Sequence, residues 1–343
     1  MGRSDGAVGH VAVGGDGRRG PWFGRTVLIT GAAGLLGGWV ARELLESGAS
    51  VVGLDVAWDG PRATIPPEGV ERIDGDIRDT PLLRDLLSGR RIDTVVHLAA
   101  QTLVGPAIED PVDTFGNNIE GSWSVLEACR NVGGVGDLRR IVVASSDKAY
   151  GDTSGRPYRE DTPLRPRHPY DTSKAVTDLL AQTYAHTYGL PVAITRCGNL
   201  YGGGDLNWSR IVPGTIRSIL EGDAPVVRSD GTFVRDYLYV KDAAAGLVAL
   251  ADAVGDRPEI AGSAFNFAAG VRLPVIEVVR RILALMGSEA EPVVLGLPLK
   301  EIPEQRVSAA RARRLLGWRP RTTMESGLRE TIDWYRGHLG TAA

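Results

Sequence analysis

Two short stretches of the chain hold side chains that could carry acid–base chemistry. One is Ser-Asp-Lys at 146–148, directly after the apolar run 141–143, and the other is Tyr170, four residues before Lys174. Strands of an open parallel sheet deliver the residues that follow them to the sheet's carboxyl edge, where such sheets bind ligands. On a helix, residues four apart share one face, and a fixed ammonium lowers the pKa of a neighbouring phenol. The pattern predicts that Tyr170 is a base near neutral pH, the alternative being a polar turn and an ordinary surface helix.

The composition is that of a globular protein without a nucleic-acid or membrane partner. At 343 residues the chain is long enough for roughly two domains. Its net charge of -3 offers no electrostatic attraction to nucleic acid or to a membrane surface. No stretch of about 18 apolar residues is present, so we expect no membrane span. Cys129 and Cys197 form neither a disulfide framework nor a metal-binding spacing, which favours a reduced, cytoplasmic setting.

Residues 1–24 are rich in glycine and polar residues, and they lack the apolar core of a secretory signal. We expect them to form a flexible tail, because they bury too little apolar surface to offset ordering. The composition of the sequence changes near 196–199, where a glycine-rich stretch begins. We therefore predict a first domain over 25–198 and a second, smaller domain over 199–343, with part of 232–267 returning to the first.

A glycine-rich turn indicates a dinucleotide site. Gly31, Gly34 and Gly37 are three residues apart, between an apolar strand at 26–30 and a helical pattern at 35–46. Such glycines let the backbone approach a pyrophosphate, which then lies at the helix N-terminus. The alternative is a glycine-rich turn used only to pack the helix against the sheet.

The next strand, 50–54, ends in Asp55. A carboxylate at this point accepts hydrogen bonds from both ribose hydroxyls and repels a 2′-phosphate. We therefore expect NAD in preference to NADP. Asp76, after a short strand at 71–73, would lie near the adenine amine, or else is an exposed loop carboxylate.

Alternating strands and helices of this length predict an α/β fold: a Rossmann-like, doubly wound parallel sheet with a smaller carboxyl-terminal α+β domain. Further elements of the sheet domain are expected at 80–88, 94–98, 113–130, 139–145, 170–188 and 191–195. In the second part we expect a glycine-rich loop at 199–205, a strand pair around 226 and 233–239, a strand at 264–267, and helices at 211–220, from 241, at 274–286 and at 325–337. Asn118, inside the helix at 113–130, is expected to have a structural polar role.

Taken together, the motifs resemble the extended short-chain dehydrogenase/reductase superfamily, in its nucleotide-sugar epimerase/dehydratase branch. The matching features are T-G-x-x-G-x-x-G at 30–37, Asp55, Asp76-Ile77, H-L-A-A at 97–100, Asn118, the Tyr170/Lys174 pair, N-x-Y-G at 199–202, R-D-Y at 235–237 and L-G-W at 316–318.

Within this branch, the stretches 97–104, 110–115, 146–150 and 199–205 look most like CDP-glucose 4,6-dehydratases. Three features depart from that subfamily. Residues 233–240 follow the general epimerase pattern, Gly105 stands where Arg is usual, and Ser308 stands where Asp commonly contacts the nucleotide. These departures leave the nucleotide and the sugar open.

The resemblance implies a role for each catalytic candidate, and the residue types agree with it. Tyr170, with Lys174 beside it, removes the proton of the sugar 4-hydroxyl while NAD accepts the hydride, and Ser146 hydrogen-bonds the same oxygen. The 4-ketone makes the C5 proton acidic. Lys148 is the candidate base for that proton and Asp147 the candidate acid for the leaving 6-hydroxyl, provided burial or neighbouring charges shift their pKa values. Return of the hydride to C6 leaves NAD unconsumed.

Other activities stay open. A nucleotide-sugar 4-epimerase or a UDP-glucuronate decarboxylase needs no acid or base at 147 and 148, where an adjacent Asp-Lys could simply be a surface ion pair. A more remote alternative is a non-catalytic NAD-binding sensor, which would have no use for a placed phenol base.

The resemblance also implies binding residues and a partner. The expected cofactor-binding residues are Gly31, Gly34, Leu35, Leu36, Gly37, Asp55, Asp76, Ile77, Leu98, Ala99, Ala100, Gln101, Asn118, Tyr170 and Lys174. The expected substrate-binding residues, for a nucleotide-diphosphate sugar, are Gln101, Asn199, Arg210, Arg235 and Arg306. Arg235 and Asn199 are expected at the diphosphate, the alternative being a structural Arg235–Asp236 pair. A homodimer is expected, with helices near 107–130 and 170–188 forming a four-helix bundle.

Overall fold

The computed structural model describes residues 20–59, 68–132, 137–298 and 302–340. Most of the predicted tail, residues 1–19, lies outside them. Trp22 is buried, and its backbone N–H donates to the carbonyl oxygen of Ser47 at 3.1 Å. Trp22, which the sequence assigned to the flexible tail, is therefore part of the packed structure.

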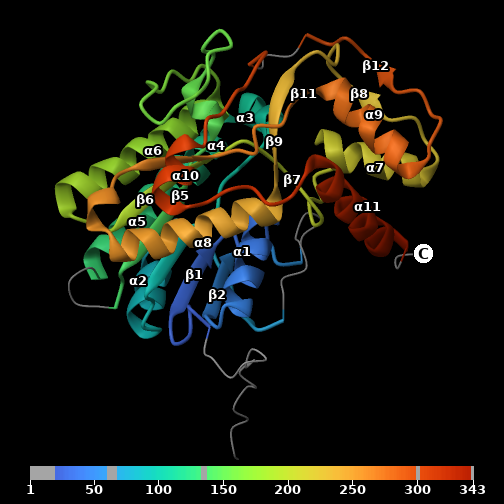
Figure 1. Ribbon diagram of the computed structural model, residues 1–343. Helices are drawn as coiled ribbons and strands as arrows, with labels where there is room; N and C mark the ends of the chain where they lie inside the picture. The colour runs from blue at the N-terminus through green and yellow to red at the C-terminus, as the bar shows by residue number, and fades with distance from the viewer. Residues whose placement is uncertain (1–19, 60–67, 133–136, 299–301, 341–343) are drawn as a thin grey trace, which may run out of the picture.

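A seven-stranded parallel sheet forms the centre of the molecule (Figure 1). Its strand order is β10-β6-β5-β4-β1-β2-β3. The predicted Rossmann-like, doubly wound fold is therefore confirmed, because the order reverses at β1, between β2 and β4. The strands are β1 (Thr26–Thr30), β2 (Ser50–Asp55), β3 (Val70–Asp74), β4 (Thr94–His97), β5 (Arg140–Ala144), β6 (Val192–Cys197) and β10 (Ala264–Phe267).

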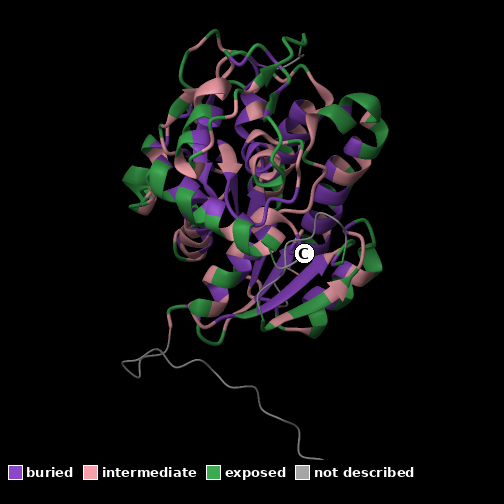
Figure 2. Cartoon of the chain, turned by 90° about the vertical axis from the view of Figure 1, so that its right-hand side faces the viewer, coloured by how far each residue is buried: buried purple, intermediate pink, exposed green. Residues whose placement is uncertain are grey.

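Helices cover both faces of this sheet, so its central strands are buried on both sides (Figure 2). On one face, Ile29 of β1 belongs to the same apolar cluster as Val40 of α1 and Leu250 of α8. On the other, Leu28 clusters with Leu83 of α2. Each such side chain contributes about 1.5–3 kcal/mol by its burial. The covering helices are α1 (Leu35–Glu46) and α8 (Val240–Asp256) on the first face, and α2 (Thr80–Gly89), α5 (Gly121–Val132) and α6 (Pro169–Tyr188) on the second.

The single helix expected at 113–130 is interrupted. The structure has α4 (Pro111–Phe115), a π-helical segment (Gly116–Glu120) and then α5, with a further short helix α3 (Val104–Glu109) before them. The interruption lies at Asn118, whose side chain bonds to neighbouring elements. The apolar spacing of the sequence did not reveal this π-helical segment.

A second region lies beyond the carboxyl edge of the sheet. Here α7 (Ile211–Glu221), α9 (Val275–Met286) and α11 (Met324–Gly340) accompany a three-stranded sheet, β11 (Arg272–Pro274), β9 (Val234–Tyr239) and β7 (Asn199–Tyr201). The expected strand pair was wrong: β8 (Val226–Val227) pairs with β12 (Val293–Val294), whereas β9 pairs with β7 and β11. Between these elements the chain returns to the large sheet, where α8 packs and β10 forms an edge, beside α10 (Ala310–Leu316).

In the part of the chain that the structure describes, no helix combines the length and the apolar character that a bilayer crossing requires.

Candidate active site

The three glycines of the turn between β1 and α1 have different surroundings. A Cβ on Gly31, which has φ +74°, would lie 2.7 Å from the backbone nitrogen of Ala99, and one on Gly37 would collide with the carbonyl oxygen of Gly31. A Cβ on Gly34 would meet only that oxygen, at 3.3 Å. The outer two glycines therefore allow close packing, whereas the backbone at Gly34 borders open space.

The N-terminus of α1 is suited to an anion. Gly34 is its N-cap and supplies no side-chain hydrogen bond, and the first turn carries no acidic residue. The first amide groups of a helix point outward and carry partial positive charge. The backbone at Leu35 and Leu36 can therefore receive a pyrophosphate, as the sequence predicts.

Asp55 lies at the end of β2 and binds the glycine-rich turn. Its Oδ2 accepts from the backbone N–H of Ala33 at 2.9 Å, and its Oδ1 from that of Ala57 at 3.1 Å. This places a carboxylate beside the turn, where an adenosine ribose would be held. Asp76 is less available, because its carboxylate pairs with Arg78 at 2.5 Å, and this pairing lowers its pKa.

Asn118 fastens the end of β4 to α6. Its Nδ2 donates to the carbonyl oxygen of Gln101 at 2.9 Å and to the hydroxyl of Ser173 at 2.8 Å, and its Oδ1 accepts from the Gln101 N–H at 2.7 Å. The expected structural role of Asn118 is thus confirmed. The Gln101 amide donates within its own loop, to the carbonyl oxygen of Leu103 at 3.0 Å. The neighbouring Leu98, Ala99 and Ala100 are half-buried, and Ile77 is buried.

Strand β5 and helix α6 bring Ser146, Tyr170 and Lys174 together. The Ser146 side chain acts on Tyr170 and lowers its pKa. The Nζ of Lys174 donates to the carbonyl oxygen of Ala144 at 2.9 Å, and the hydroxyl of Ser145 donates to the Lys174 carbonyl oxygen at 3.0 Å. These bonds join the first turns of α6 to the end of β5, and all three candidate side chains are buried.

The ionisation of this set differs from the sequence prediction. Burial raises the pKa of Tyr170 to about 12, although the Ser146 side chain opposes the shift. The expected lowering of the Tyr170 pKa was therefore wrong for the protein chain alone. Burial also lowers the pKa of Lys174 to about 8, because an ammonium loses its hydration there.

Asp147 and Lys148 follow in a short 3-10 turn (Asp147–Tyr150). Asp147 is only 2% exposed, whereas Lys148 is half-buried. Burial raises the pKa of Asp147 to about 6, with the charges of Lys148 and Arg235 opposing that rise. The alternative of a surface ion pair does not describe this buried carboxylate. A carboxyl group with this pKa can hold a proton to donate.

Gln305 is a site residue that the sequence did not reveal. Its Nε2 donates to Oδ2 of Asp147 at 2.9 Å, and its Oε1 accepts from Nδ2 of Asn199 at 3.4 Å. Gln305 lies 158 residues from Asp147 in the chain. No local spacing could have linked the two.

Of the arginines predicted to bind substrate, two act electrostatically on the candidate catalytic residues Asp147 and Tyr170. The charge of Arg235 acts on Asp147, and that of Arg210 acts on Tyr170. Arg235 is buried and donates to the Ile302 carbonyl oxygen at 2.7 Å. Arg210 pairs with Asp205 at 3.1 Å.

The other substrate candidates have different surroundings. Arg306 is half-exposed and pairs with Glu304 at 2.6 Å, and Asn199 contacts Gln305. The neighbour of Arg235 in β9, Asp236, accepts from the Gly270 N–H at 3.1 Å, and consecutive strand residues point to opposite faces of a sheet.

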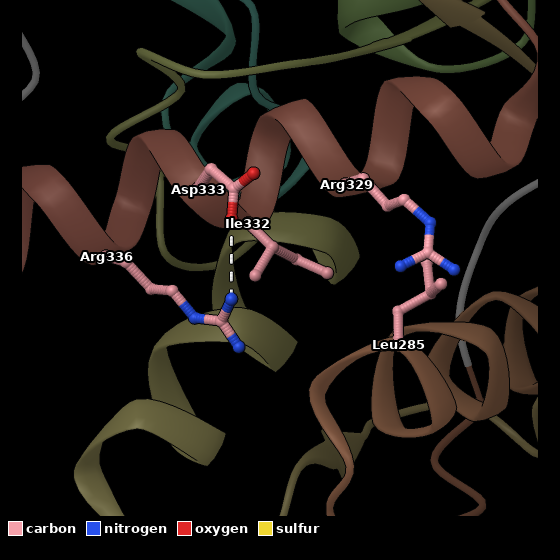
Figure 3. Close-up of a pocket in the computed structure, with 5 residues that line it drawn as sticks. All are labelled: Leu285, Arg329, Ile332, Asp333 and Arg336. Carbon is pink, nitrogen blue, oxygen red and sulfur yellow. Dashed lines mark hydrogen bonds and ion pairs between the residues drawn. The ribbon is translucent and has the colours of Figure 1, made fainter.

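One small hollow, of about 80 Å³, lies elsewhere, between α9 and α11. Figure 3 shows Arg336 paired with Asp333 at its rim and Arg329 on the other side of Ile332. None of the predicted site residues lines it, so it is separate from the catalytic set.

Sequence comparison identifies a family and relatives. The NAD dependent epimerase/dehydratase family matches residues 27–266. The chain is 33% identical over 334 residues to a dTDP-glucose 4,6-dehydratase of Xanthomonas campestris, covering 90% of this chain and 93% of that protein. It is 32% identical over 322 residues to a trifunctional UDP-glucose 4,6-dehydratase/UDP-4-keto-6-deoxy-D-glucose 3,5-epimerase/UDP-4-keto-L-rhamnose-reductase of Arabidopsis thaliana. That match covers 91% of this chain but 47% of the plant protein, so the chain spans about half its length.

The solved structures of a 4,6-dehydratase and of a 4-epimerase are both similar to the structure of this chain. The dTDP-glucose 4,6-dehydratase DesIV from Streptomyces venezuelae, with NAD and TYD bound, has a TM-score of 0.82 and 29% identity over 92% of this chain and 98% of that one. The UDP-glucose 4-epimerase of Thermotoga maritima, with UDP-glucose, has a TM-score of 0.83 and 25% identity over 92% and 99% of the two chains.

Proposed function

The chain belongs to the NAD dependent epimerase/dehydratase family, and we propose that within this family it is a nucleotide-sugar 4,6-dehydratase that forms a 4-keto-6-deoxy sugar. The observation that carries this proposal is the buried Asp147, with a pKa of about 6, next to Lys148 and one residue from Ser146. Relatives named as 4,6-dehydratases, each about one-third identical, support it.

The residues of the first domain fit the family's cofactor. The open backbone at Gly34, the uncapped start of α1 and the carboxylate of Asp55 would hold the two phosphates and the adenosine ribose. When bound, NAD supplies a hydride acceptor for C4, a hydride donor for C6 and a positively charged ring.

The first half of the proposed reaction uses Tyr170 and Ser146. Tyr170 takes the proton of the sugar 4-hydroxyl, and the C4–H bond breaks with its electron pair, which leaves a ketone. The Ser146 hydroxyl, which lowers the pKa of Tyr170, can donate to the same sugar oxygen. Because the interaction with Tyr170 favours the phenolate over the phenol, Ser146 helps to keep Tyr170 in the deprotonated form that can accept the proton. Lys174 anchors α6 to the end of β5 and adds positive charge.

The second half uses Lys148 and Asp147. The 4-ketone acidifies the C5 proton, and Lys148 is the candidate base that removes it. Asp147 donates its proton to the 6-hydroxyl, the C6–O bond breaks and water leaves. Reduction at C6 and reprotonation at C5 then complete the 4-keto-6-deoxy sugar. Both groups stand in the turn that follows β5, next to the residues that form the ketone.

Substrate recognition is part of the same proposal. We assign the nucleotide-diphosphate sugar to Gln101, Asn199, Arg210, Arg235 and Arg306. Arg235 is the candidate for the diphosphate, since a planar guanidinium can bond two phosphate oxygens at once. Arg235→Ala should raise KM about 10- to 100-fold, the value of a charge-assisted hydrogen bond, in initial-rate kinetics. An unchanged KM would indicate that Arg235 instead stabilises the backbone at residues 302 and 303.

We also propose a homodimer in a cytoplasmic setting. The helices expected at its interface expose apolar side chains: Val112 on α4 is 78% exposed, Trp123 on α5 45%, and Leu179 on α6 53%. Pairing α5 and α6 of two copies would cover them. Static light scattering at micromolar protein should give twice the chain mass, and a monomer mass would contradict the dimer. Both cysteines are free, as a reduced compartment requires.

The function is tested by incubating the protein with dTDP-glucose, UDP-glucose, CDP-glucose, GDP-mannose and UDP-glucuronate, followed by mass spectrometry. Loss of one water from a nucleotide-hexose supports the dehydratase. Unchanged mass with altered sugar configuration would make the protein an epimerase, and loss of carbon dioxide a decarboxylase. Absence of any turnover would favour a non-catalytic NAD-binding protein.

A further inference from the structure

Residues 302–309, which we name the strap, run between the second region and the catalytic turn. On one side the strap bonds to β9: the Val234 N–H donates to the Pro303 carbonyl oxygen at 3.0 Å, and the Gln305 N–H donates to the Val234 carbonyl oxygen at 3.1 Å. Gln305 is therefore held at its backbone by the strand that also carries Arg235.

On its other side the strap bonds to Tyr158. The Tyr158 N–H donates to the Arg306 carbonyl oxygen at 2.7 Å, and the Ser308 N–H donates to the Tyr158 carbonyl oxygen at 3.0 Å. The Tyr158 ring stacks on Tyr150 at 4.8 Å, and Tyr150 ends the turn that holds Asp147. The strap is thus fixed relative to both regions of the molecule.

The side chain of Gln305 is fully buried and points to Asp147. An amide nitrogen only donates hydrogen bonds, and an amide oxygen only accepts them. Because Asn199 donates to Oε1, the nitrogen of Gln305 is the atom that faces Oδ2 of Asp147, at 2.9 Å. Oδ2 therefore acts as an acceptor.

This arrangement distinguishes the two oxygens of the Asp147 carboxyl group. A proton on Oδ2 competes with the N–H that already points at it, so the proton is favoured on Oδ1. The Ser146 hydroxyl donates to Oδ1 at 3.3 Å, but a hydroxyl can also turn to accept, so unlike the amide nitrogen of Gln305 it accommodates a proton on the oxygen that it faces. Oδ1 is thus the carboxyl oxygen that faces Ser146, one of the candidate catalytic residues.

We propose that Gln305 is a positioning residue for the general acid: its amide holds Oδ2 of Asp147 as an acceptor, so that the transferable proton is carried on Oδ1. This inference rests on the proposed dehydratase function. It also gives the second region a part in the chemistry, since the strap carries Gln305 from β9 to the end of β5.

Other charged and titratable groups act on Asp147 or feel its charge, and each could contribute to a pH profile. They come from its own turn, from α6, from β6, from β9 and from the loop after the turn: Lys148, Tyr170, Asp171, Cys197, Arg235, Asp236 and Tyr158. The test therefore compares variants at Gln305 with the wild type over the same pH range.

The test uses Gln305→Met, which keeps the length of the side chain and removes the donor. At pH values low enough to protonate Asp147 in both proteins, kcat should fall about tenfold, the value of one hydrogen bond, with KM unchanged. Loss of a donor to the anion raises the pKa of Asp147, so the fall in kcat at higher pH should move upward. Reduced cofactor should accumulate during turnover, because elimination has become the slow step.

A second variant separates positioning from folding. In Gln305→Glu, the introduced carboxyl group can donate to Oδ2 while it is protonated, but once ionised it only accepts and draws the Asp147 proton to Oδ2, away from Oδ1. Its kcat should approach the wild-type value at the lowest pH and fall more steeply as pH rises. A Gln305 that only supported the fold would lower the yield of active protein by the same factor at every pH.

Gln182→Met is the matched control, since the Gln182 amide donates to an Asp178 carboxylate oxygen at 2.7 Å away from the catalytic turn. It should keep the wild-type pH profile. If Asp147→Asn abolishes water loss while folded Gln305→Met retains the wild-type kcat and profile, this inference is wrong and the dehydratase assignment stands. If Asp147→Asn itself turns over normally, the proposed function fails.

Discussion

The two halves of the proposed catalytic site are held in different ways. Ser146, Tyr170 and Lys174 are positioned by β5 and α6, and the bond that joins Lys174 to Ala144 spans 30 residues of chain. Asp147 depends in addition on Gln305, 158 residues away. The proposed oxidation half is thus positioned by β5 and α6, whereas the proposed elimination half also has a contact from the strap. A chain could therefore keep the first half and change the second by altering a distant segment.

The largest effect expected from breaking one half concerns Tyr170. Tyr170→Phe removes the group that accepts the 4-hydroxyl proton, so it should lower the rate of C4 oxidation by about 10²- to 10⁴-fold. Stopped-flow absorbance of the reduced cofactor measures this step directly. Oxidation at the wild-type rate would show that another group is the base.

The elimination half should show its own pH dependence. Asp147 must be protonated to act as an acid, and its pKa is about 6. Water loss should therefore decline as pH rises through 6, by up to about tenfold per pH unit where Asp147 limits the rate. C4 oxidation is measured in the same samples, because that step does not use the Asp147 proton and is linked to Asp147 only through its charge on Tyr170. If C4 oxidation and water loss showed the same dependence on pH, the division of the site into an oxidation half and an elimination half would be wrong.

A further expected effect is on stability. The pKa of Asp147 rises from 3.8 to about 6 on burial, so the folded protein holds this proton more tightly than the unfolded chain. The resulting stabilisation is complete below pH 3.8 and is lost as pH rises through 6. Asp147→Asn should thus be more stable than the wild type above pH 7, by about 2–3 kcal/mol, with the difference vanishing near pH 4. The midpoints of urea unfolding at pH 4 and pH 8 measure this difference in stability. An Asp147→Asn variant less stable than the wild type at pH 8 would contradict the free-energy cost of burying the Asp147 carboxylate.

The sequence predicted the oxidation half better than the elimination half. Strand β1, helix α1 and the Tyr170/Lys174 spacing depend on local periodicity and turn chemistry, so their positions could be predicted within a residue or two. The raised pKa of Tyr170 could not, because it depends on burial by residues distant in the sequence. The π segment at Asn118 and the pairing of β8 with β12 are likewise set by long-range contacts. Gln305 was missed for the same reason: it follows no motif, and only the folded strap brings it to Asp147.

The central claim, that Asp147 and Lys148 perform an elimination after oxidation, is tested most directly by one measurement on Lys148→Ala and Asp147→Asn. Each variant is mixed with the nucleotide-hexose that the wild type dehydrates, and the absorbance of reduced cofactor is recorded together with product mass. The account predicts that both variants accumulate reduced cofactor and a 4-keto sugar that keeps its 6-hydroxyl, with water loss slowed about 10²- to 10⁴-fold. Water loss at near wild-type rate in both variants would show that the pair is structural.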